Sequence, residues 1–203
     1  MYPVMLARMS AGFTIWITGL PGSGKMALAQ ALAARLPHPV EVIDSAKLRA
    51  SPLGASLGFS REDRDLNCGR HAFAARLLAK NGVIGIVKAV SPYRATRDAI
   101  RQGAGRFVEV HVSTSREVCI DRDPKGVWAR ALAGEIRNFT GVDDPYEEPL
   151  NADAVVDLGV VSAEDGAETV LEALARLGYV TEGVDDEDSA IQQALEEGGF
   201  TST

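Results

Sequence analysis

A glycine-rich loop between a strand pattern and a helix pattern is the feature that most constrains this chain. Residues 13–18 are aromatic and β-branched, as in a buried strand, and residues 26–36 are rich in alanine and leucine, which favours a helix ending before Pro37. Between them stands Gly19-Leu20-Pro21-Gly22-Ser23-Gly24-Lys25. Such a loop turns several backbone N–H groups and a helix N-terminus toward one point. The pattern predicts a phosphate-binding loop in which Lys25 supplies a cation for β- and γ-phosphates.

Strand and helix patterns alternate along the rest of the chain. Strands are predicted at 40–43, 83–90, 107–112 and 154–158, and helices at 60–80, 92–102, 115–121, 128–135 and 163–177. In the longest helix, Ser60 can cap the first turn, and Leu66, Phe73 and Leu77 make an apolar stripe. The alternation predicts an α/β fold with three α/β/α layers and a mostly parallel sheet of about five strands.

Composition and charge limit the classes of function. No run approaches 18 apolar residues, and the first residues lack a secretory pattern, so we expect neither a membrane span nor export. Cys68 and Cys119 lack metal-ligand spacing, which favours a reduced, cytoplasmic protein. The net charge of −7 belongs to residues 182–203, which hold seven of the 28 acidic residues and none of the 21 basic ones. The remainder is formally neutral, which argues against a general nucleic-acid surface.

We expect one domain over residues 1–181, followed by an acidic, flexible tail over 182–203. Within the domain, residues 121–151 are rich in glycine, proline and charge. The segment is too long for a plain connector, and long loops in compact domains are usually functional. We therefore expect a lid at about 121–150.

One position departs from the usual phosphate loop. The residue after the lysine is normally Ser or Thr, whose hydroxyl binds Mg²⁺, but here it is Met26. A thioether is a poor ligand for a hard cation. The sequence predicts phosphate binding and leaves the placement of a metal open.

Five blocks of sequence together resemble the adenylylsulfate kinases (APS kinases), a family of P-loop kinases. The first is the loop itself, preceded by Thr18. The others are Leu57-Gly58-Phe59-Ser60-Arg61-Glu62-Asp63-Arg64 with Asn67 and Arg70; Ser91-Pro92-Tyr93-Arg94; Arg122-Asp123-Pro124-Lys125-Gly126; and residues 134–147, Gly-Glu-Ile-Arg-Asn-Phe-Thr-Gly-Val-Asp-Asp-Pro-Tyr-Glu. They stand in the family's order and cover roughly residues 12–157.

The resemblance implies transfer of the ATP γ-phosphate to the 3′-hydroxyl of adenosine 5′-phosphosulfate (APS), which gives PAPS in sulfate assimilation. It implies ATP and Mg²⁺ as cofactors, and a homodimer and ATP sulfurylase as partners. By position, the implied catalytic residues are Lys25, Asp44 and Ser91. The implied ATP-binding residues are Gly19, Leu20, Pro21, Gly22, Ser23, Gly24, Lys25, Met26, Arg122, Pro124 and Lys125. The implied APS-binding residues are Arg49, Phe59, Arg64, Asn67 and Phe139, with the two phenylalanines sandwiching the adenine.

Each of these residues also has a simpler interpretation. Arg64 and Asn67 suit a solvated helix face, and Phe59 and Phe139 suit ordinary packing. Ser91 suits the cap of the helix that Pro92 opens. The joint arrangement, rather than any single residue, favours the functional interpretation.

The resemblance breaks near the second strand. The family's Asp-Gly-Asp-Asn, followed one residue later by Arg, reads Asp44-Ser45-Ala46-Lys47-Leu48-Arg49 here. Ala46 replaces an acidic group near Mg²⁺, and Asp44 remains as a weak candidate metal ligand. Lys47 and Lys88 stand where the family has an asparagine and a small residue.

Three hypotheses follow from these departures. The chain is a working APS kinase, a catalytically impaired module that binds nucleotide or APS and regulates sulfate activation, or a kinase for another small anionic substrate.

Overall fold

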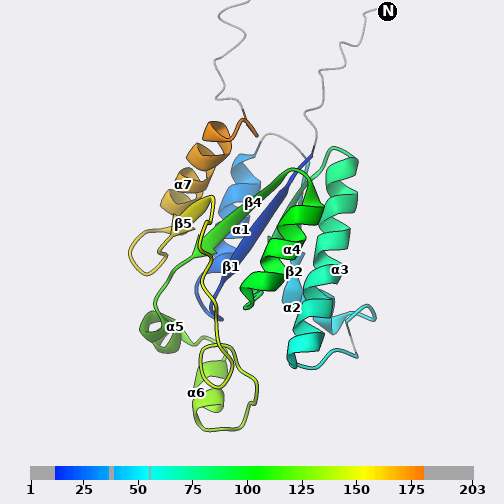
Figure 1. The fold of residues 1–203 in the computed structure, drawn as a ribbon. Helices are drawn as coiled ribbons and strands as arrows, with labels where there is room; N and C mark the ends of the chain where they lie inside the picture. Colours follow the sequence, from blue (N-terminus) through cyan, green and yellow to red (C-terminus); the bar gives the residue numbers. More distant parts are fainter. Residues whose placement is uncertain (1–11, 37–38, 55, 181–203) are drawn as a thin grey trace, which may run out of the picture.

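A five-stranded parallel sheet forms the centre of the molecule (Figure 1). The computed structural model describes residues 12–36, 39–54 and 56–180. The strands are β1 (Thr14–Gly19), β2 (Val40–Asp44), β3 (Ile84–Lys88), β4 (Phe107–Val112) and β5 (Ala154–Val156), in the order β2-β3-β1-β4-β5. The predicted acidic tail lies outside the described residues.

Helices cover both faces of the sheet, which confirms the predicted α/β/α layers. The helices are α1 (Lys25–Arg35), α2 (Ser45–Ala50), α3 (Arg61–Lys80), α4 (Arg94–Ala104), α5 (Arg116–Arg122), α6 (Val127–Leu132) and α7 (Ala163–Arg176). The sequence patterns located all of them except the six-residue α2. They also extended β3 by three residues, Val83, Ala89 and Val90, beyond the bounds that the structure gives it.

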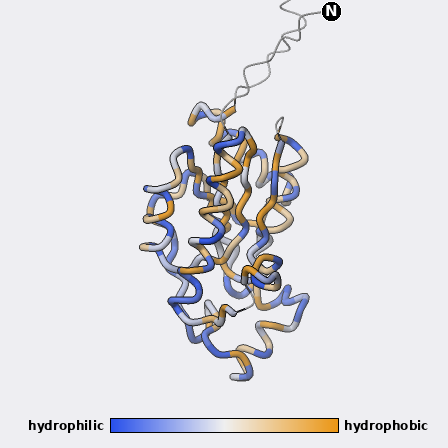
Figure 2. The backbone as a smooth tube through the Cα atoms, turned by 90° about the vertical axis from the view of Figure 1, so that its right-hand side faces the viewer, coloured by the Kyte–Doolittle hydropathy of each residue, from blue (hydrophilic) through white to orange (hydrophobic). Residues whose placement is uncertain are grey.

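Alternation along β1 divides the core in two. Ile15 and Ile17 pack with α1 and α7, whereas Trp16, between them in sequence, packs against α3 and α4 on the opposite face. The side-chain period of two in a strand explains this division. In Figure 2 the central strands are largely hydrophobic, and hydrophilic segments surround them. In the part of the chain that the structure describes, no helix is long and apolar enough to cross a membrane.

The apolar stripe on α3 lies on the outer side of that helix. Leu66, Phe73 and Leu77 are 52%, 61% and 54% exposed. The buried face of α3 instead holds a mixed set of side chains: Arg64, Asn67, Cys68, His71 and Ala75. Ser60 caps the helix as predicted, accepting a hydrogen bond from Asp63 N at 3.2 Å. The inward face of α3 is thus mixed in polarity, and the predicted apolar stripe is not its buried face.

The connecting helices change from one face of the sheet to the other between β1 and β3. These strands are neighbours, but the chain leaves β1 for α1 on one face and leaves β3 for α4 on the other. In open α/β sheets, ligands bind beyond the carboxyl ends of the strands at such a switch point. The predicted phosphate loop follows β1, and Lys88 ends β3. Helices α5 and α6 lie beyond this end of the sheet (Figure 1).

Candidate active site

A cavity of about 550 Å³ opens at this switch point. It brings together many of the residues that the sequence singled out, from segments far apart in the chain. Of the predicted site residues, those lining it are Pro21, Gly22, Lys25, Arg49, Phe59, Arg64, Asn67, Ser91, Pro124 and Lys125. A smaller adjoining cavity of about 250 Å³ is lined by residues 22–27, Lys88 and Pro124.

The phosphate loop has the backbone that its sequence predicts. Gly22 and Gly24 have φ values of +80° and +97°, in the left-handed region that glycine tolerates. Helix α1 begins at Lys25, so its free N–H groups face the smaller cavity. Lys25 Nζ donates to Gly19 O at 2.8 Å and to Ser23 Oγ at 3.2 Å. Burial, and secondarily the charge of Lys88, lowers the pKa of Lys25 to about 7.

The predicted lid is joined to the phosphate loop. Trp128 on α6 is fully buried, and its Nε1 donates to Pro21 O at 3.0 Å. Gly141 lies against the same indole, where an added Cβ would come within 2.7 Å of Trp128 Cη2. Asp123 caps α6 by accepting from Val127 N at 2.9 Å and Ala129 N at 3.0 Å. The phosphate loop and the predicted lid are therefore connected through the side chain of Trp128.

Two arginines flank the ring of Phe59 at the other end of the cavity. The guanidinium of Arg49 lies 4.6 Å from the ring centre and that of Arg64 lies 5.6 Å from it. Arg49 donates to Leu57 O at 3.1 Å and to Gly58 O. Arg64 donates to Phe59 O at 3.2 Å and to Asn138 O. Backbone carbonyls thus hold a flat ring and two planar cations at one wall, and Phe59 stays half exposed to the cavity.

Asn67 carries an unused hydrogen-bond acceptor into this wall. Its Nδ2 donates to Ser45 Oγ at 3.1 Å. Its Oδ1 is buried and has no hydrogen-bond partner among the described residues. A buried polar atom without a partner is costly, which favours a ligand donor at this point.

Five of the predicted site residues line neither cavity: Gly19, Leu20, Asp44, Arg122 and Phe139. Phe139 packs edge-on against Trp128, with ring centres 5.0 Å apart. Arg122 donates to Leu158 O at 2.6 Å. Asn138, the residue before Phe139, does contact the cavity wall, because its backbone O accepts a hydrogen bond from Arg64.

Ser91 lines the cavity in a strained backbone conformation. Its φ of +39° is uncommon for a residue with a side chain and costs about 1–3 kcal/mol. The cap of α4 is Tyr93, so Ser91 is not the helix cap that one interpretation of the sequence gave. Ser91 Oγ accepts from Trp16 Nε1 at 2.9 Å. Because indole only donates, the hydroxyl hydrogen of Ser91 remains available to a ligand oxygen.

A buried ion pair that the sequence did not predict supports this position. Arg97 donates to Ser91 O at 2.7 Å, to Glu147 O at 2.6 Å and to Glu109 Oε1 at 2.8 Å. Arg97 is 1% exposed. The pair joins the serine block to the end of the block at 134–147. From the sequence, an arginine on a helix is expected at the surface. The burial of Arg97 is explained by Glu109, which faces it.

The corner beside the phosphate loop holds a lysine–aspartate pair. Lys88 Nζ lies 2.8 Å from Asp44 Oδ1, and Ala46 N donates to the same oxygen at 2.9 Å. Burial opposes ionisation here, but these two hydrogen bonds outweigh it and hold the pKa of Asp44 below its usual range. Lys47, the other unusual lysine, is exposed on α2.

The side chains of this corner do not fit a protein-bound Mg²⁺. Mg²⁺ requires oxygen ligands in near-octahedral geometry. Met26 offers a thioether, Ala46 offers nothing, and the Asp44 carboxylate is engaged by Lys88. In residues 12–36, 39–54 and 56–180, no group of three or more His, Cys, Asp and Glu side chains could hold a metal ion.

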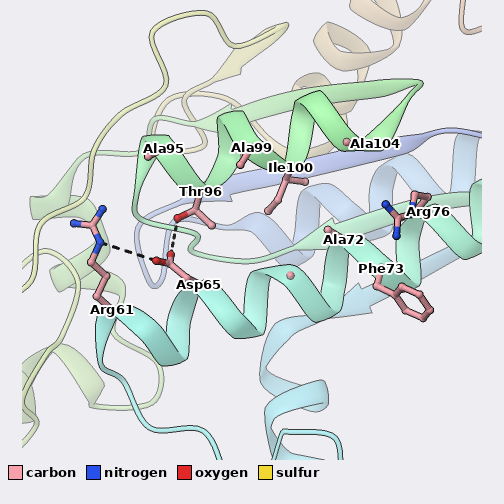
Figure 3. A pocket seen from close by; sticks show the side chains of 12 residues that line it. Arg61, Asp65, Ala72, Phe73, Arg76, Ala95, Thr96, Ala99, Ile100 and Ala104 are labelled. Atoms are coloured by element: carbon pink, nitrogen blue, oxygen red, sulfur yellow. Dashed lines mark hydrogen bonds and ion pairs between the residues drawn. The ribbon is translucent and has the colours of Figure 1, made fainter.

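A separate groove of about 540 Å³ runs along the outer side of α3 and α4 (Figure 3). Half of the twelve residues that line it are alanines and glycines, and Phe73 and Arg76 lie toward one end. At the other end Asp65 accepts from Thr96 Oγ1 at 2.5 Å and pairs with Arg61 at 4.0 Å. The groove contains no residue of the phosphate loop, so we place the active site at the switch point.

The fold and the site define a P-loop nucleotide-binding protein of the kinase type. The sequence pattern of the adenylylsulphate kinase family matches residues 11–157. An adenylyl-sulfate kinase of Picosynechococcus sp. is 46% identical over 173 residues, covering 84% of this chain and 97% of the relative. A probable bifunctional SAT/APS kinase of Sorangium cellulosum is also 46% identical, and the match covers 84% of this chain and 30% of that longer protein.

Solved structures agree with this assignment. The APS kinase of Mycobacterium tuberculosis, in complex with AMPPNP and APS, is 40% identical and superposes with a TM-score of 0.77. That match covers 81% of this chain and 98% of the mycobacterial chain. This chain therefore belongs to the adenylylsulphate kinase family.

Proposed function

We propose that this protein transfers the γ-phosphate of ATP to the 3′-hydroxyl of APS and so forms PAPS. The observation that carries the proposal is one cavity lined both by the phosphate loop and by the Arg49–Phe59–Arg64–Asn67 wall. A nucleoside triphosphate suits the phosphate loop, and an adenine with an anionic phosphosulfate suits the wall of arginines, Phe59 and Asn67. The mycobacterial relative was solved with an ATP analogue and APS together, which supports this pairing of ligands.

The phosphate loop is the proposed donor end. Its N–H groups and the α1 N-terminus would hold the phosphates of ATP, and Lys25 would exchange its loop carbonyls for phosphate oxygens, which are stronger acceptors. Pro124 and Lys125 line the cavity near α6 and would lie beside the ATP adenine. Mg²⁺ that accompanies ATP would be held by the nucleotide phosphates and water, because the side chains offer no oxygen set for it.

The arginine wall is the proposed acceptor end. Arg49 and Arg64 present planar donor sets suited to an oxyanion, and Phe59 offers a face on which an adenine can stack. A base stacked on an aromatic ring gains about 1–3 kcal/mol. Asn67 Oδ1 would accept from a ligand N–H or O–H.

Ser91 lies where the two ends meet. Phosphoryl transfer depends mainly on positioning and charge stabilisation, with little covalent chemistry left to side chains. The free hydroxyl hydrogen of Ser91 would donate to an oxygen of the transferred phosphoryl group. We expect the chain to act as a homodimer and alongside ATP sulfurylase. The bifunctional SAT/APS kinase supports the second expectation.

The test is PAPS formation from ATP and APS by the purified chain, with AMP as the control acceptor. We expect turnover of about 1–100 s⁻¹, the usual range of kinases, and a far lower rate with AMP. Turnover near zero from folded protein would reject the proposal. In that case, a rise in melting temperature with APS or PAPS would indicate the binding module, and a rise only with another anionic metabolite would indicate another substrate.

The binding-module function has one observation in its favour. The carboxylate of Asp44, which the resemblance makes catalytic, is already paired with Lys88. A carboxylate in that state is a weaker proton acceptor, and general-base action contributes about 10²–10⁴-fold to rates.

A further inference from the structure

We propose that the Lys88 ammonium positions phosphate at the corner beside the phosphate loop. It supplies the positive charge that a protein-held metal ion would otherwise supply, because the side chains of this corner cannot hold one. The inference rests on the proposed function for the identity of the donor, ATP. It concerns a residue that departs from the family pattern, and it accounts for three departures, at Met26, Ala46 and Lys88, as one change.

The sheet places Lys88 between the two strands that matter. In the parallel register Lys88 is opposite Ile17 in β1 and opposite Asp44 in β2. It therefore emerges at the switch point, one strand from the phosphate loop and one strand from the acidic residue. At this register Lys88 lines the cavity formed by residues 22–27 of the phosphate loop and α1, whereas Lys47 on α2 is exposed.

The lysine is held toward the cavity rather than toward solvent. Its side chain is 18% exposed and lines both the larger cavity and the one beside the α1 N-terminus. Lys25 is the other lysine that lines both. The two ammonium groups also act on each other, since the charge of Lys88 contributes to the lowered pKa of Lys25. Two like charges facing one cavity favour an anionic occupant.

Asp44 acts as the anchor of this cation. Its Oδ1 accepts from Ala46 N, which fixes the carboxylate at the start of α2, and also pairs with Lys88 at 2.8 Å. The ammonium has three donors, so one bond to Asp44 leaves others for phosphate oxygens. In this arrangement the carboxylate orients a cation of the protein, and Ala46 leaves open the space into which a second carboxylate would project.

The test measures ATP binding with Mg²⁺ removed by chelator, so that it depends on neither catalysis nor APS. Lys88→Met removes the charge and keeps the length, Lys88→Arg keeps the charge, and Lys47→Met is the matched control from the same corner. We expect Lys88→Met to weaken ATP binding about tenfold, the equivalent of one charge-assisted hydrogen bond. We expect Lys88→Arg to restore most of the loss and Lys47→Met to change affinity less than about twofold.

Three results would overturn the inference: equal affinities for Lys88→Met and wild type, equal losses for Lys88→Met and Lys47→Met, or no rescue by arginine. Melting curves of each variant separate loss of binding from loss of fold, and a Lys88→Met protein that does not fold is replaced by Lys88→Gln in the same measurement. The readout also separates this inference from the proposed function. A chain that forms PAPS but shows no Lys88 effect contradicts only the inference, and a chain that shows the effect but forms no PAPS contradicts only the function.

Discussion

The two ends of the active-site cavity are held in different ways. At the acceptor end, Arg49 and Arg64 are held mainly by the carbonyl groups of residues 57–59 and 138, and Asp144 pairs with Arg64 at 3.6 Å. At the phosphate corner, Lys88 and Asp44 are fixed by each other through a pair of side chains. The acceptor end keeps the residues that the family resemblance implies, and the corner departs from them at Met26, Ala46 and Lys88.

Under the proposed function, substrate recognition by the arginine wall and charge supply at the phosphate corner would therefore be separable. Backbone carbonyls are present whatever the neighbouring side chains are, so the arginine wall persists when the corner changes. The corner depends on side chains that must match one another. A carboxylate at Ala46 would compete for Lys88, and a metal beside Lys88 would be repelled by its charge. The replacements therefore form one consistent set.

The largest effect is expected from Lys25→Met, which removes the cation of the phosphate loop itself. We expect turnover to fall about 10²–10³-fold, as when one preorganised donor is removed from a transition state. Steady-state PAPS formation checks this, with Lys47→Met as the control. A loss no larger than that of the control would mean that the phosphate loop is not the donor site.

Arg64→Lys tests the acceptor end alone. The planar fork of arginine reaches Phe59 O, Asn138 O and Asp144 together, and lysine cannot reproduce it. We expect the KM for APS to rise at least about tenfold, while the Kd for ATP stays within about twofold. Arg76→Lys, on the outer end of the same helix, is the control. An equal rise in both constants would show that the two ends are not separable.

The pH dependence of ATP binding tests the phosphate end. Free Lys25 has a pKa of about 7, so above pH 7 it must take up a proton when it binds phosphate. ATP affinity should therefore fall by up to about tenfold per pH unit from pH 7.5 to 8.5, a range in which ATP phosphates are already ionised. Calorimetry in two buffers of different ionisation enthalpy would show the proton uptake. A flat affinity over this range contradicts the assigned charge state.

The smallest expected effect concerns the lid. Trp128→Phe keeps the buried ring and loses the bond from Nε1 to Pro21 O. One neutral hydrogen bond contributes about 0.5–1.5 kcal/mol, so we expect ATP affinity to fall about two- to tenfold. Nucleotide titrations of the variant check this, with the KM for APS as the internal reference. An unchanged ATP affinity would separate the lid from the phosphate loop.

The fold could be predicted because its signals are periodic and local. The apolar residues of β1, the glycines of the loop and the cap at Ser60 each specify their own segment. The sequence missed α2 because six residues beginning at Ser45 carry too short a pattern. The apolar residues Leu66, Phe73 and Leu77 suggested the inner face of α3, but these three residues are exposed. The residues that face the sheet are a different set, and several of them line the cavity.

The site could be predicted only in part. Motif blocks indicated Lys25, Arg64 and Ser91, but the roles of Arg97 and Lys88 depend on partners distant in sequence. Arg97 becomes a buried positioning residue only because Glu109 faces it from β4. Lys88 reaches Asp44 only because the parallel register places those two residues side by side. No local sequence pattern specifies the register between two strands that are joined by the 39 residues 45–83.

The most direct test of the role of Lys88 compares the Mg²⁺ dependence of ATP binding in the natural chain and in a variant in which the family's metal-binding side chains are restored. The variant combines Met26→Ser, Ala46→Asp and Lys88→Ala. We expect Mg²⁺ to improve ATP affinity less than about threefold in the natural chain and more than about tenfold in the rebuilt one. A natural chain that already binds ATP tenfold more tightly with Mg²⁺, and a rebuilt chain that is no different from it, would contradict the claim that Lys88 has replaced a protein-held metal.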